Sequence, residues 1–505
     1  AKGIGIKALC EYDVIRNLTE AYDDKKDNQK RESVLFAFEC ISQAFGPLFE
    51  PYVVEILPIV LKSFGDSSAE VREATDYASR VIMKNTTSYG IKKMIPLAIS
   101  NLDDMAWRTK KGSVELLGSM AYLDPAQLSS SLPNIVPNIV SVLNDTHKEV
   151  RKAADAALKK FGEVIRNPEI QELVPILLKA IGDPTKYTDE ALDSLISTQF
   201  VHYIDGPSLA LIIHVIDRGM QDRSANTKKK ACQIVGNMAI LVDTNDLMPY
   251  LSRLVSELND AVVDPVPQTR ATAARALGSL VEKLGEDKFP GLMSSLLAAL
   301  QDEEKPGNRL GSAQALAEII SGLGISKLEE MLPVIIAGTT SSKSFVREGF
   351  MPLLLFLPVS YGSQFAPYLS KTIPPILAGL ADTLEEIRDV SLRAGRLIVN
   401  NYAKKAVDLL LPELEKGLSD SNARIRLSSV ELTGELLFKI SGISGKQELA
   451  DDVTLSKNVA KAFNDVLGNE RRNNILSSLF VCRSDTSGAV RATAANIWMA
   501  LVANT

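Results

Sequence analysis

The sequence predicts an all-α fold, built as a solenoid of antiparallel helix pairs. Two observations lead to this prediction. One helix pair is well defined between Asp124 and Phe161, and imperfect copies of it follow one another along nearly all of the 505 residues. Because neither helix of such a pair can bury its apolar stripe alone, each pair must pack against similar pairs on both sides.

The first helix of the defining pair begins after Asp124, a good N-cap, with Pro125 at the first helical position, where a missing N–H costs nothing. Its apolar residues recur at the spacing of one helix face: Leu132, Ile135, Val136, Ile139, Val140 and Leu143. A polar corner from Asn144 to His147 follows. From Val150 the pattern resumes with small alanines, which let the paired helix approach closely.

An acidic residue marks the corner of each copy. The corner acids are Asp66, Asp104, Asp145, Asp183, Asp222, Asp260, Asp302, Asp382 and Asp420, with Ser341 and Ser342 where one is missing. Neighbouring corners lie roughly 38 to 42 residues apart, near the period of about 40 to 47 typical of HEAT-type repeats. The sequence therefore predicts a HEAT-repeat α-solenoid, a right-handed superhelix of about 11 to 12 helix pairs.

A basic residue recurs near the start of each second helix. We expect the Arg of one repeat to lie beside the Asp of its own or the next corner, giving a ladder of charge-assisted hydrogen bonds. The ladder members are Asp66, Arg72, Asp145, Arg151, Asp382, Arg388, Asp420 and Arg426. Nucleic-acid contact is the weaker alternative for these arginines. Asp189 stands where the fifth repeat should have its Arg, which predicts a break in the ladder.

Taken in order, the elements suggest one long array and an irregular continuation. Residues 1–46 hold the first pair, and residues 1–443 form the HEAT-repeat array, with a long corner at 259–268. Residues 444–505 form a continuation with an extra helix near 453–467 and a further repeat. Because the final helix remains strongly apolar, we expect the array to extend past Thr505, as a slice of a longer protein.

Composition limits the possible classes of function. The chain has 56 Lys and Arg against 62 Asp and Glu, a net charge of −6, so any RNA contact must be local. The longest apolar run, Phe350 to Val359, is too short to span a bilayer. The four cysteines have no metal-like spacing, and we interpret them as reduced core thiols of a cytosolic or nuclear protein.

No residue constellation predicts catalysis, a metal site or a cofactor. Gly445-Lys446 lacks the upstream glycine and the following Ser or Thr of a P-loop. His147 lies in a corner, and His202 and His214 are placed in apolar helical surroundings without partners at ligand spacing. We therefore predict a protein that is not an enzyme.

Two basic clusters open the second helices of the third and sixth repeats. They are candidate contacts to RNA phosphates: Arg108, Lys110, Lys111, Lys228, Lys229 and Lys230. The alternative is a solvated helix face. Because the clusters recur at the same position of two repeats, we expect them to project from one face of the superhelix. Only Arg108 and Lys228 among them are assigned to ladder positions.

Two stretches carry a resemblance to a known family. Trp107-Arg108-Thr109-Lys110 and the segments 165–169 and 174–181 resemble the HEAT region of the fungal translation elongation factor three. That factor continues into ATP-binding cassettes, which do not occur in this chain. The runs 99–128, 206–222 and 265–285 are similar to the family of large general-control translational activators, whose likeness covers most of the chain.

The resemblance implies a cytoplasmic, ribosome-bound regulatory scaffold. Such a scaffold contacts rRNA and ribosomal proteins and helps to activate the kinase of initiation factor two during amino-acid starvation or ribosome collision. It also implies an ATP-binding-cassette partner protein, and a kinase contact through a region outside this segment. A nuclear-transport-receptor-like adaptor is the alternative, although several second helices here begin with lysines instead of acids. An ATP-dependent translation factor would need nucleotide motifs that this segment lacks.

Overall fold

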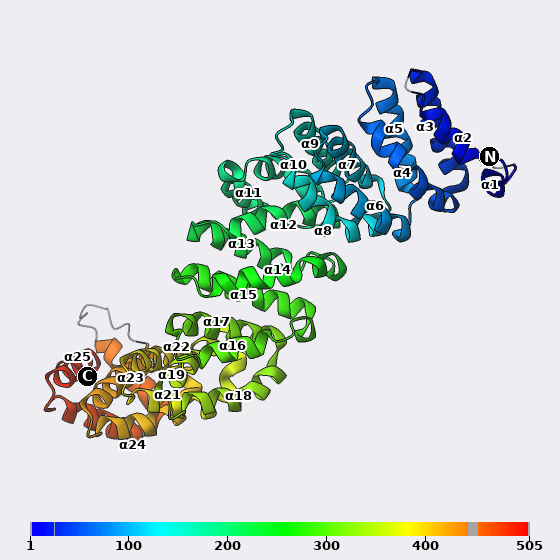
Figure 1. Cartoon of the computed structure of the whole chain (residues 1–505). Helices are drawn as coiled ribbons and strands as arrows, with labels where there is room; N and C mark the ends of the chain where they lie inside the picture. Colours follow the sequence, from blue (N-terminus) through cyan, green and yellow to red (C-terminus); the bar gives the residue numbers. More distant parts are fainter. Residues whose placement is uncertain (1–2, 25, 443–452, 503–505) are drawn as a thin grey trace. The chain divides into compact units, whose positions relative to one another are not determined.

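The computed structural model describes residues 3–24, 26–442 and 453–502, and all regular secondary structure in these ranges is helical (Figure 1). A parallel bridge between Ile204 and Val242 is an isolated contact between two loops. The predicted all-helical repeat fold is confirmed. The handedness of the superhelix stays a prediction. Gly445 and Lys446 lie outside the described residues.

The chain divides into two compact units, and each is described by itself. The N-terminal unit comprises Ala1–Leu258 and the C-terminal unit Asn259–Thr505. The helices that begin in the N-terminal unit are α1 Lys7–Glu11, α2 Val14–Tyr22, α3 Asn28–Phe45, η1 Gly46–Phe49, α4 Glu50–Phe64, α5 Ala69–Lys84, α6 Ser88–Ser100, η2 Asn101–Asp103, α7 Trp107–Ser119, η3 Met120–Tyr122, α8 Pro125–Ser141, α9 Lys148–Glu163, α10 Pro168–Gly182, α11 Pro184–Ser197, α12 Gly206–Met220, α13 Ala225–Met238 and α14 Thr244–Val262.

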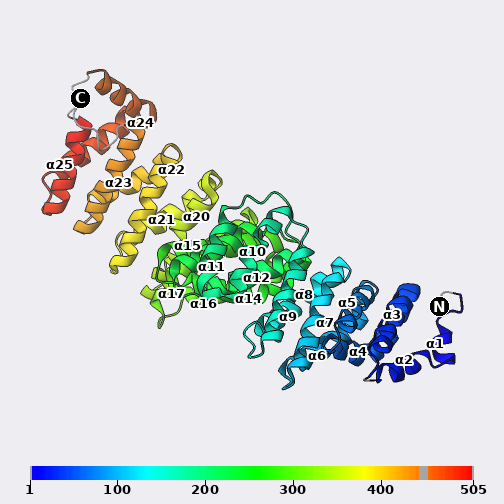
Figure 2. The same cartoon turned by 90° about the horizontal axis from the view of Figure 1, so that it is seen from above.

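The C-terminal unit continues the same arrangement. Its helices are α15 Pro267–Leu284, η4 Glu286–Lys288, α16 Leu292–Leu300, α17 Pro306–Leu323, α18 Ile325–Thr339, α19 Ser344–Phe350, α20 Leu353–Tyr361, η5 Gly362–Tyr368, α21 Leu369–Gly379, α22 Glu385–Leu418, α23 Ala423–Ser441, α24 Val453–Cys482 and α25 Gly488–Val502. Figure 2 shows α21, α22 and α23 following one another in this unit, where α22 packs against both of its neighbours.

Second helices of successive repeats pack side by side in both units. α3 packs on α5 and α7 on α9 in the N-terminal unit, and α15 packs on α17 in the C-terminal unit. The alanines predicted to allow this approach are buried, with Ala154 fully inaccessible to solvent. Prolines lie inside several first helices, as Pro58 in α4, Pro175 in α10 and Pro412 in α22 illustrate.

Two long helices join neighbouring repeats without a loop. The backbone of α22 leaves the helical conformation at Tyr402 (φ −129°, ψ 15°), and that of α24 leaves it at Gly468. The part of α24 before Gly468 corresponds to the extra helix predicted near residues 453–467. Each interruption divides a long helix into two shorter helical segments.

The corner of the seventh repeat differs from the prediction. Asp260 lies within α14, which runs to Val262, so the predicted long corner at 259–268 is wrong in its first half. Asp264 takes the corner role, because its carboxylate accepts the Val266 N–H at 2.9 Å. The apolar stripe of α14 continues for one more turn than the polar residues Asn259 and Asp260 suggested.

Two further predictions are corrected. Only Cys232 and Cys482 are buried thiols, whereas Cys10 and Cys40 are exposed, so burial does not explain all four. His202 lies outside any helix, and its Nδ1 is 2.6 Å from the Glu169 carboxylate. Apolar neighbours in the sequence therefore did not predict burial of Cys10, Cys40 and His202.

One stretch, Asn28–Phe64, is long and apolar enough to cross a membrane by length and composition alone. In the structure a turn at Gly46, with φ of 57°, separates α3 from the helices that follow. Leu35, Phe38 and Phe49 are fully inaccessible to solvent. These three residues belong to the core of the first two repeats, whereas Phe36 and Leu48 of the same stretch are exposed.

Candidate functional site

Most corner acids fold their own corner, whereas Asp183 makes no side-chain bond to the start of the following helix. The Asp66 carboxylate accepts the Ser68 N–H at 2.9 Å, and the Asp145 carboxylate accepts the His147 N–H at 2.8 Å. The corners at Asp104, Asp222, Asp302, Asp382, Asp420 and Asp485 contain the same bond. Such a bond fixes a turn and replaces water at a donor that the following helix leaves unpaired.

The arginine of the same repeat donates to a backbone carbonyl of the corner and does not bind the corner carboxylate. Arg72 donates from Nη1 to the Asp66 carbonyl at 2.6 Å, and Arg151 donates to the Asp145 carbonyl at 2.6 Å. Arg388 and Arg426 make the equivalent bonds to the carbonyls of Asp382 and Asp420, at 2.7 Å each. These bonds pair carbonyl groups that the tight corner leaves without a helical partner.

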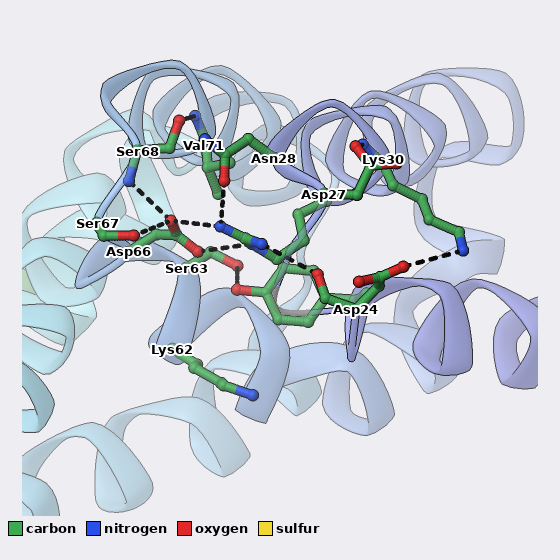
Figure 3. A network of polar contacts seen from close by, with 12 residues as sticks. Asp24, Asp27, Asn28, Lys30, Lys62, Ser63, Asp66, Ser67, Ser68 and Val71 are labelled. Carbon is green, nitrogen blue, oxygen red and sulfur yellow. Dashed lines mark hydrogen bonds and ion pairs between the residues drawn. The ribbon is translucent and has the colours of Figure 1, made fainter.

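The carboxylate of a corner is bound instead by a basic residue of the preceding repeat. Arg31 donates to both oxygens of Asp66, at 3.0 and 3.1 Å, in the network drawn in Figure 3. The other such pairs are Lys110 with Asp145, Arg347 with Asp382 and Arg426 with Asp485. Arg426 therefore contacts two consecutive corners, whereas the bonds of Arg72, Arg151 and Arg388 given above go to their own corners.

These pairs alter the acidity of the corner acids. Burial alone would raise the pKa of Asp66, but hydrogen bonds from Arg31 and from the Ser68 N–H outweigh it and lower the pKa. The Arg426 guanidinium is the main reason that the pKa of Asp485 falls to about 2. Because the ionised form is favoured in the folded state, these bonds stabilise the fold above the ordinary carboxyl pKa and weaken as pH falls.

In the fifth repeat the charges of the ladder are exchanged, because the second helix carries an acid where other repeats have a basic residue. Asp189, in α11, accepts a bond from Lys230 in α13 at 2.9 Å, and Asp193 lies 2.7 Å from the same ammonium. Burial opposes the charge of Lys230, but the hydrogen bonds to both carboxylates outweigh it and raise the pKa of this lysine. The position of Asp189 is thus part of a reversed ion pair between neighbouring second helices.

Five of the six candidate ribosome contacts have intramolecular partners, and the sixth, Arg108, is exposed. Lys110 and Lys230 form the ion pairs above, and the Lys111 ammonium lies 3.7 Å from the Glu115 carboxylate with its side chain only 16% exposed. Lys228 and Lys229 are half-buried and have intramolecular interactions. Lys110, and not Arg108, holds the ladder position of the third repeat, which corrects the assignment made from sequence.

Arg108 is the exposed member of these clusters. Its guanidinium lies over the Trp107 ring, 4.8 Å from the ring centroid. The Trp107 ring stacks on His147 of the next corner, with centroids 4.1 Å apart and planes 7° apart. The starts of α7 and α9 thus present a cation beside two parallel aromatic rings, an arrangement that can meet phosphates and bases.

A charged cavity of about 420 Å³ lies between the second helices α5, α7 and α9. Lys160 of α9 binds Asp76 of α5 at 2.8 Å across it, and Lys111 and Glu115 line it from α7. Burial raises the pKa of Glu115 to about 7, although Lys111 and Lys160 act in the opposite direction. At neutral pH this carboxyl is therefore partly protonated.

We expect Glu115→Gln to change how stability depends on pH. A carboxyl whose pKa is higher in the folded than in the unfolded state makes the fold less stable as pH rises from about 4.5 to about 7. The variant should therefore melt above the wild type near pH 8 and lose this advantage near pH 5. Glu149→Gln is the control, because hydrogen bonding to Lys152 lowers the pKa of Glu149. A difference in melting temperature that is equal at both pH values contradicts the assignment.

Sequence reasoning missed a recurring tyrosine contact. The Tyr361 hydroxyl lies 2.8 Å from the Ile320 carbonyl and 2.9 Å from that of Gly324, at the end of the preceding second helix. One repeat later, the Tyr402 hydroxyl contacts the carbonyls of Pro358 and Gly362. The signal was present in the sequence as two tyrosines one repeat period apart, Tyr361 and Tyr402.

Comparison with protein families matches two parts of the chain. The model described as "EF3 N-terminal HEAT repeat" matches residues 1–158. The model described as "Elongation factor 3/GNC1 HEAT repeat" matches residues 186–290. Both matches lie on the helix pairs described above, and both descriptions name HEAT repeats.

Individual relatives match the chain over its whole length. It is 67% identical over 505 residues to the eIF-2-alpha kinase activator GCN1 of Saccharomyces cerevisiae, and 46% identical over 512 residues to the stalled ribosome sensor GCN1 of Homo sapiens. It spans 19% of the length of each of these proteins. Among solved structures, Kap121p bound to Ste12p is similar over 98% of this chain and 54% of that chain, with a TM-score of 0.42 and 14% identity.

Proposed function

The chain is a segment of the GCN1 family, and on that premise we propose that it is a ribosome-binding regulatory scaffold. It promotes activation of the kinase that phosphorylates the alpha subunit of initiation factor two, during amino-acid starvation or ribosome collision. The observation that carries the proposal is the 67% identity to the yeast kinase activator across all 505 residues. The name of the human relative, a stalled ribosome sensor, supports the ribosome as the partner.

The role assigned to the segment is non-enzymatic and cytoplasmic. A HEAT array offers a long row of helix ends and corners, which suits contact with a large and irregular partner such as rRNA with its proteins. The kinase is reached through a region outside this segment, and an ATP-binding-cassette protein is a further partner. The identity to GCN1 proteins favours this function over that of a nuclear-transport adaptor.

The ribosome contact that the structure supports best is at Arg108. A guanidinium held over an indole is pre-oriented for phosphate, and the Trp107 and His147 rings offer stacking surfaces beside it. Lys110, Lys111 and Lys230 have intramolecular carboxylate neighbours, so reversing their charge would damage the fold as well as any interface. A test that reverses all six residues together could not separate these effects.

We expect Arg108→Glu to weaken co-sedimentation of this chain with ribosomes by about five-fold, which corresponds to about 1 kcal/mol. Wild-type binding should also weaken as salt is raised, because phosphate contacts release counterions. Arg424→Glu is the matched control: Arg424 is also exposed and is also the second residue of a second helix, α23. The contact is refuted at Arg108 if both variants pellet like the wild type. Failure of the wild-type chain to pellet would refute ribosome binding by this segment.

A further inference from the structure

A cavity of about 610 Å³ opens in the C-terminal unit where α22 is interrupted. Tyr402, the residue with non-helical backbone angles, is buried there, and its hydroxyl is already bound to carbonyls of the preceding repeat. The mouth of the cavity is formed by residues on both sides of this interruption, by the start of η5 and by the end of α23. The residues with side-chain donors are Ser363, Asn400, Asn401, Lys404, Lys405 and Lys439.

The charge of this cavity differs from that of the cavity between α5, α7 and α9. Lys404, Lys405 and Lys439 are all exposed, and among the described residues none of them has an ion-pair partner. No carboxylate is among the described residues that line the cavity. In contrast, the cavity between α5, α7 and α9 contains Asp76 and Glu115 beside its lysines. In a chain of net charge −6, three exposed ammonium groups at one opening, without a carboxylate partner among the described residues, indicate a site for an external anion.

The neutral groups of the cavity suit a phosphate. The amides of Asn400 and Asn401 and the hydroxyl of Ser363 can each donate a hydrogen bond, and phosphate oxygens only accept. A metal cation is a poor fit, because hard cations require carboxylate or carbonyl oxygens around them. The cavity also lacks an exposed aromatic ring among its described lining, so it offers no surface on which a base could stack.

We propose that this cavity, lined by Lys404, Lys405 and Lys439, binds a phosphate of an RNA backbone. The proposal rests on the proposed function, since the RNA would be that of the ribosome. Contacts of this kind position a protein on RNA without reading its sequence, which agrees with a cavity of ammonium and amide donors and no stacking ring. A free nucleotide or phosphate shares the chemistry, and the experiment separates these sources.

The test compares RNA binding by two triple variants of this chain. One variant carries Lys404→Gln, Lys405→Gln and Lys439→Gln. The control carries Lys305→Gln, Lys343→Gln and Lys416→Gln, which removes the same charge from exposed lysines of the same unit, near the corners. Lys416 lies fourteen residues beyond Tyr402, which is roughly 20 Å along a helix at 1.5 Å per residue. Because all six lysines are exposed, both variants should melt like the wild type.

Binding is measured as the fluorescence anisotropy of a labelled single-stranded RNA at several salt concentrations. The cavity variant should bind at least ten-fold more weakly, and its salt dependence of log K should be less steep by about 2, as expected for the loss of three contacts. The control should change by less than about two-fold. A third variant that carries Lys404→Arg, Lys405→Arg and Lys439→Arg should retain binding. Equal weakening in the cavity variant and the control would overturn the proposal, because net charge alone would then explain it.

Competition identifies the source of the phosphate. If inorganic phosphate or ATP in ten-fold excess over RNA does not displace the labelled RNA, the result supports a site for the RNA backbone. Displacement of the RNA by phosphate or by ATP at that excess would overturn the proposal. Tight binding of ATP without binding of RNA would overturn it as well. Co-sedimentation of wild-type chain with ribosomes tests the proposed function separately. If the wild type pellets but its RNA affinity does not depend on Lys404, Lys405 and Lys439, the cavity proposal alone fails.

Discussion

Gly349→Ala should destabilise the C-terminal unit by about 3 kcal/mol, at the upper end of the usual cost of overpacking. Gly349 lies in α19 against the end of α16, and an added Cβ would meet the Leu300 carbonyl oxygen at 2.0 Å and its carbon at 2.8 Å. Both atoms belong to the backbone, so no side-chain rotation can relieve the clash. The two helices must move apart, and the leucine core between them loosens.

Gly307→Ala is the control for this prediction. Gly307 lies in the first turn of α17 with open space around it, so alanine should be neutral or stabilising there by up to about 1 kcal/mol. Thermal unfolding should place the Gly349 variant about 6 to 12 °C below the wild type. Hydrogen exchange should show the loss in α16 and α19 first. Equal melting of the two glycine variants would show that the close approach at Gly349 is not structural.

Arg31→Met should destabilise the N-terminal unit by about 3 kcal/mol or more, the usual cost of removing one partner of a buried ion pair. The side chains of Arg31 and Asp66 are only 6% and 10% exposed. Arg31 also donates to the Asp24 carbonyl at 3.0 Å and to Asn28 Oδ1 at 2.8 Å. Methionine is apolar and unbranched, so the variant removes the charge while still filling much of the space.

Arg16→Met is the matched control, because the Arg16–Glu20 pair is 73% and 64% exposed and should contribute little. The midpoint of denaturant unfolding should fall for Arg31→Met and stay near the wild type for Arg16→Met. The exchange of amides in α3 and α5 reports the local effect. Arg31→Met with wild-type stability would show that Asp66 is held by its own corner alone.

Much of the fold was predictable because its signals are local. The N-cap role of Asp124 and the apolar face from Leu132 onward depend on residues within a few turns of one another, and the structure places α8 there, from Pro125 to Ser141. The Asp66 and Asp145 corners follow in the same way from bonds between residues two positions apart. The failure at Asp260 had a local cause too, since a polar pair was given more weight than the apolar stripe of α14.

The partners across repeats were not predictable from the chain. Asp145 could have been bound by Arg108 or by Lys110, and only the rotation of α7 against the next corner decides for Lys110. Asp189 looked like a gap in the ladder until α13 brought Lys230 to it. Arg72 looked like a partner for a carboxylate, but its guanidinium reaches the Asp66 carbonyl instead.

By itself, the sequence determined the helix pairs, their period, most of their corners and the absence of recognisable catalytic motifs, because hydrophobic spacing and corner bonds act over short stretches of chain. The tertiary structure decided which charges are used within the fold and which remain for a partner. Lys110 and Lys230 are paired, whereas Arg108 and the three lysines around Tyr402 face solvent. The physical reason is that an ion pair depends on the distance between side chains of neighbouring repeats, and the packing angle of their helices sets that distance.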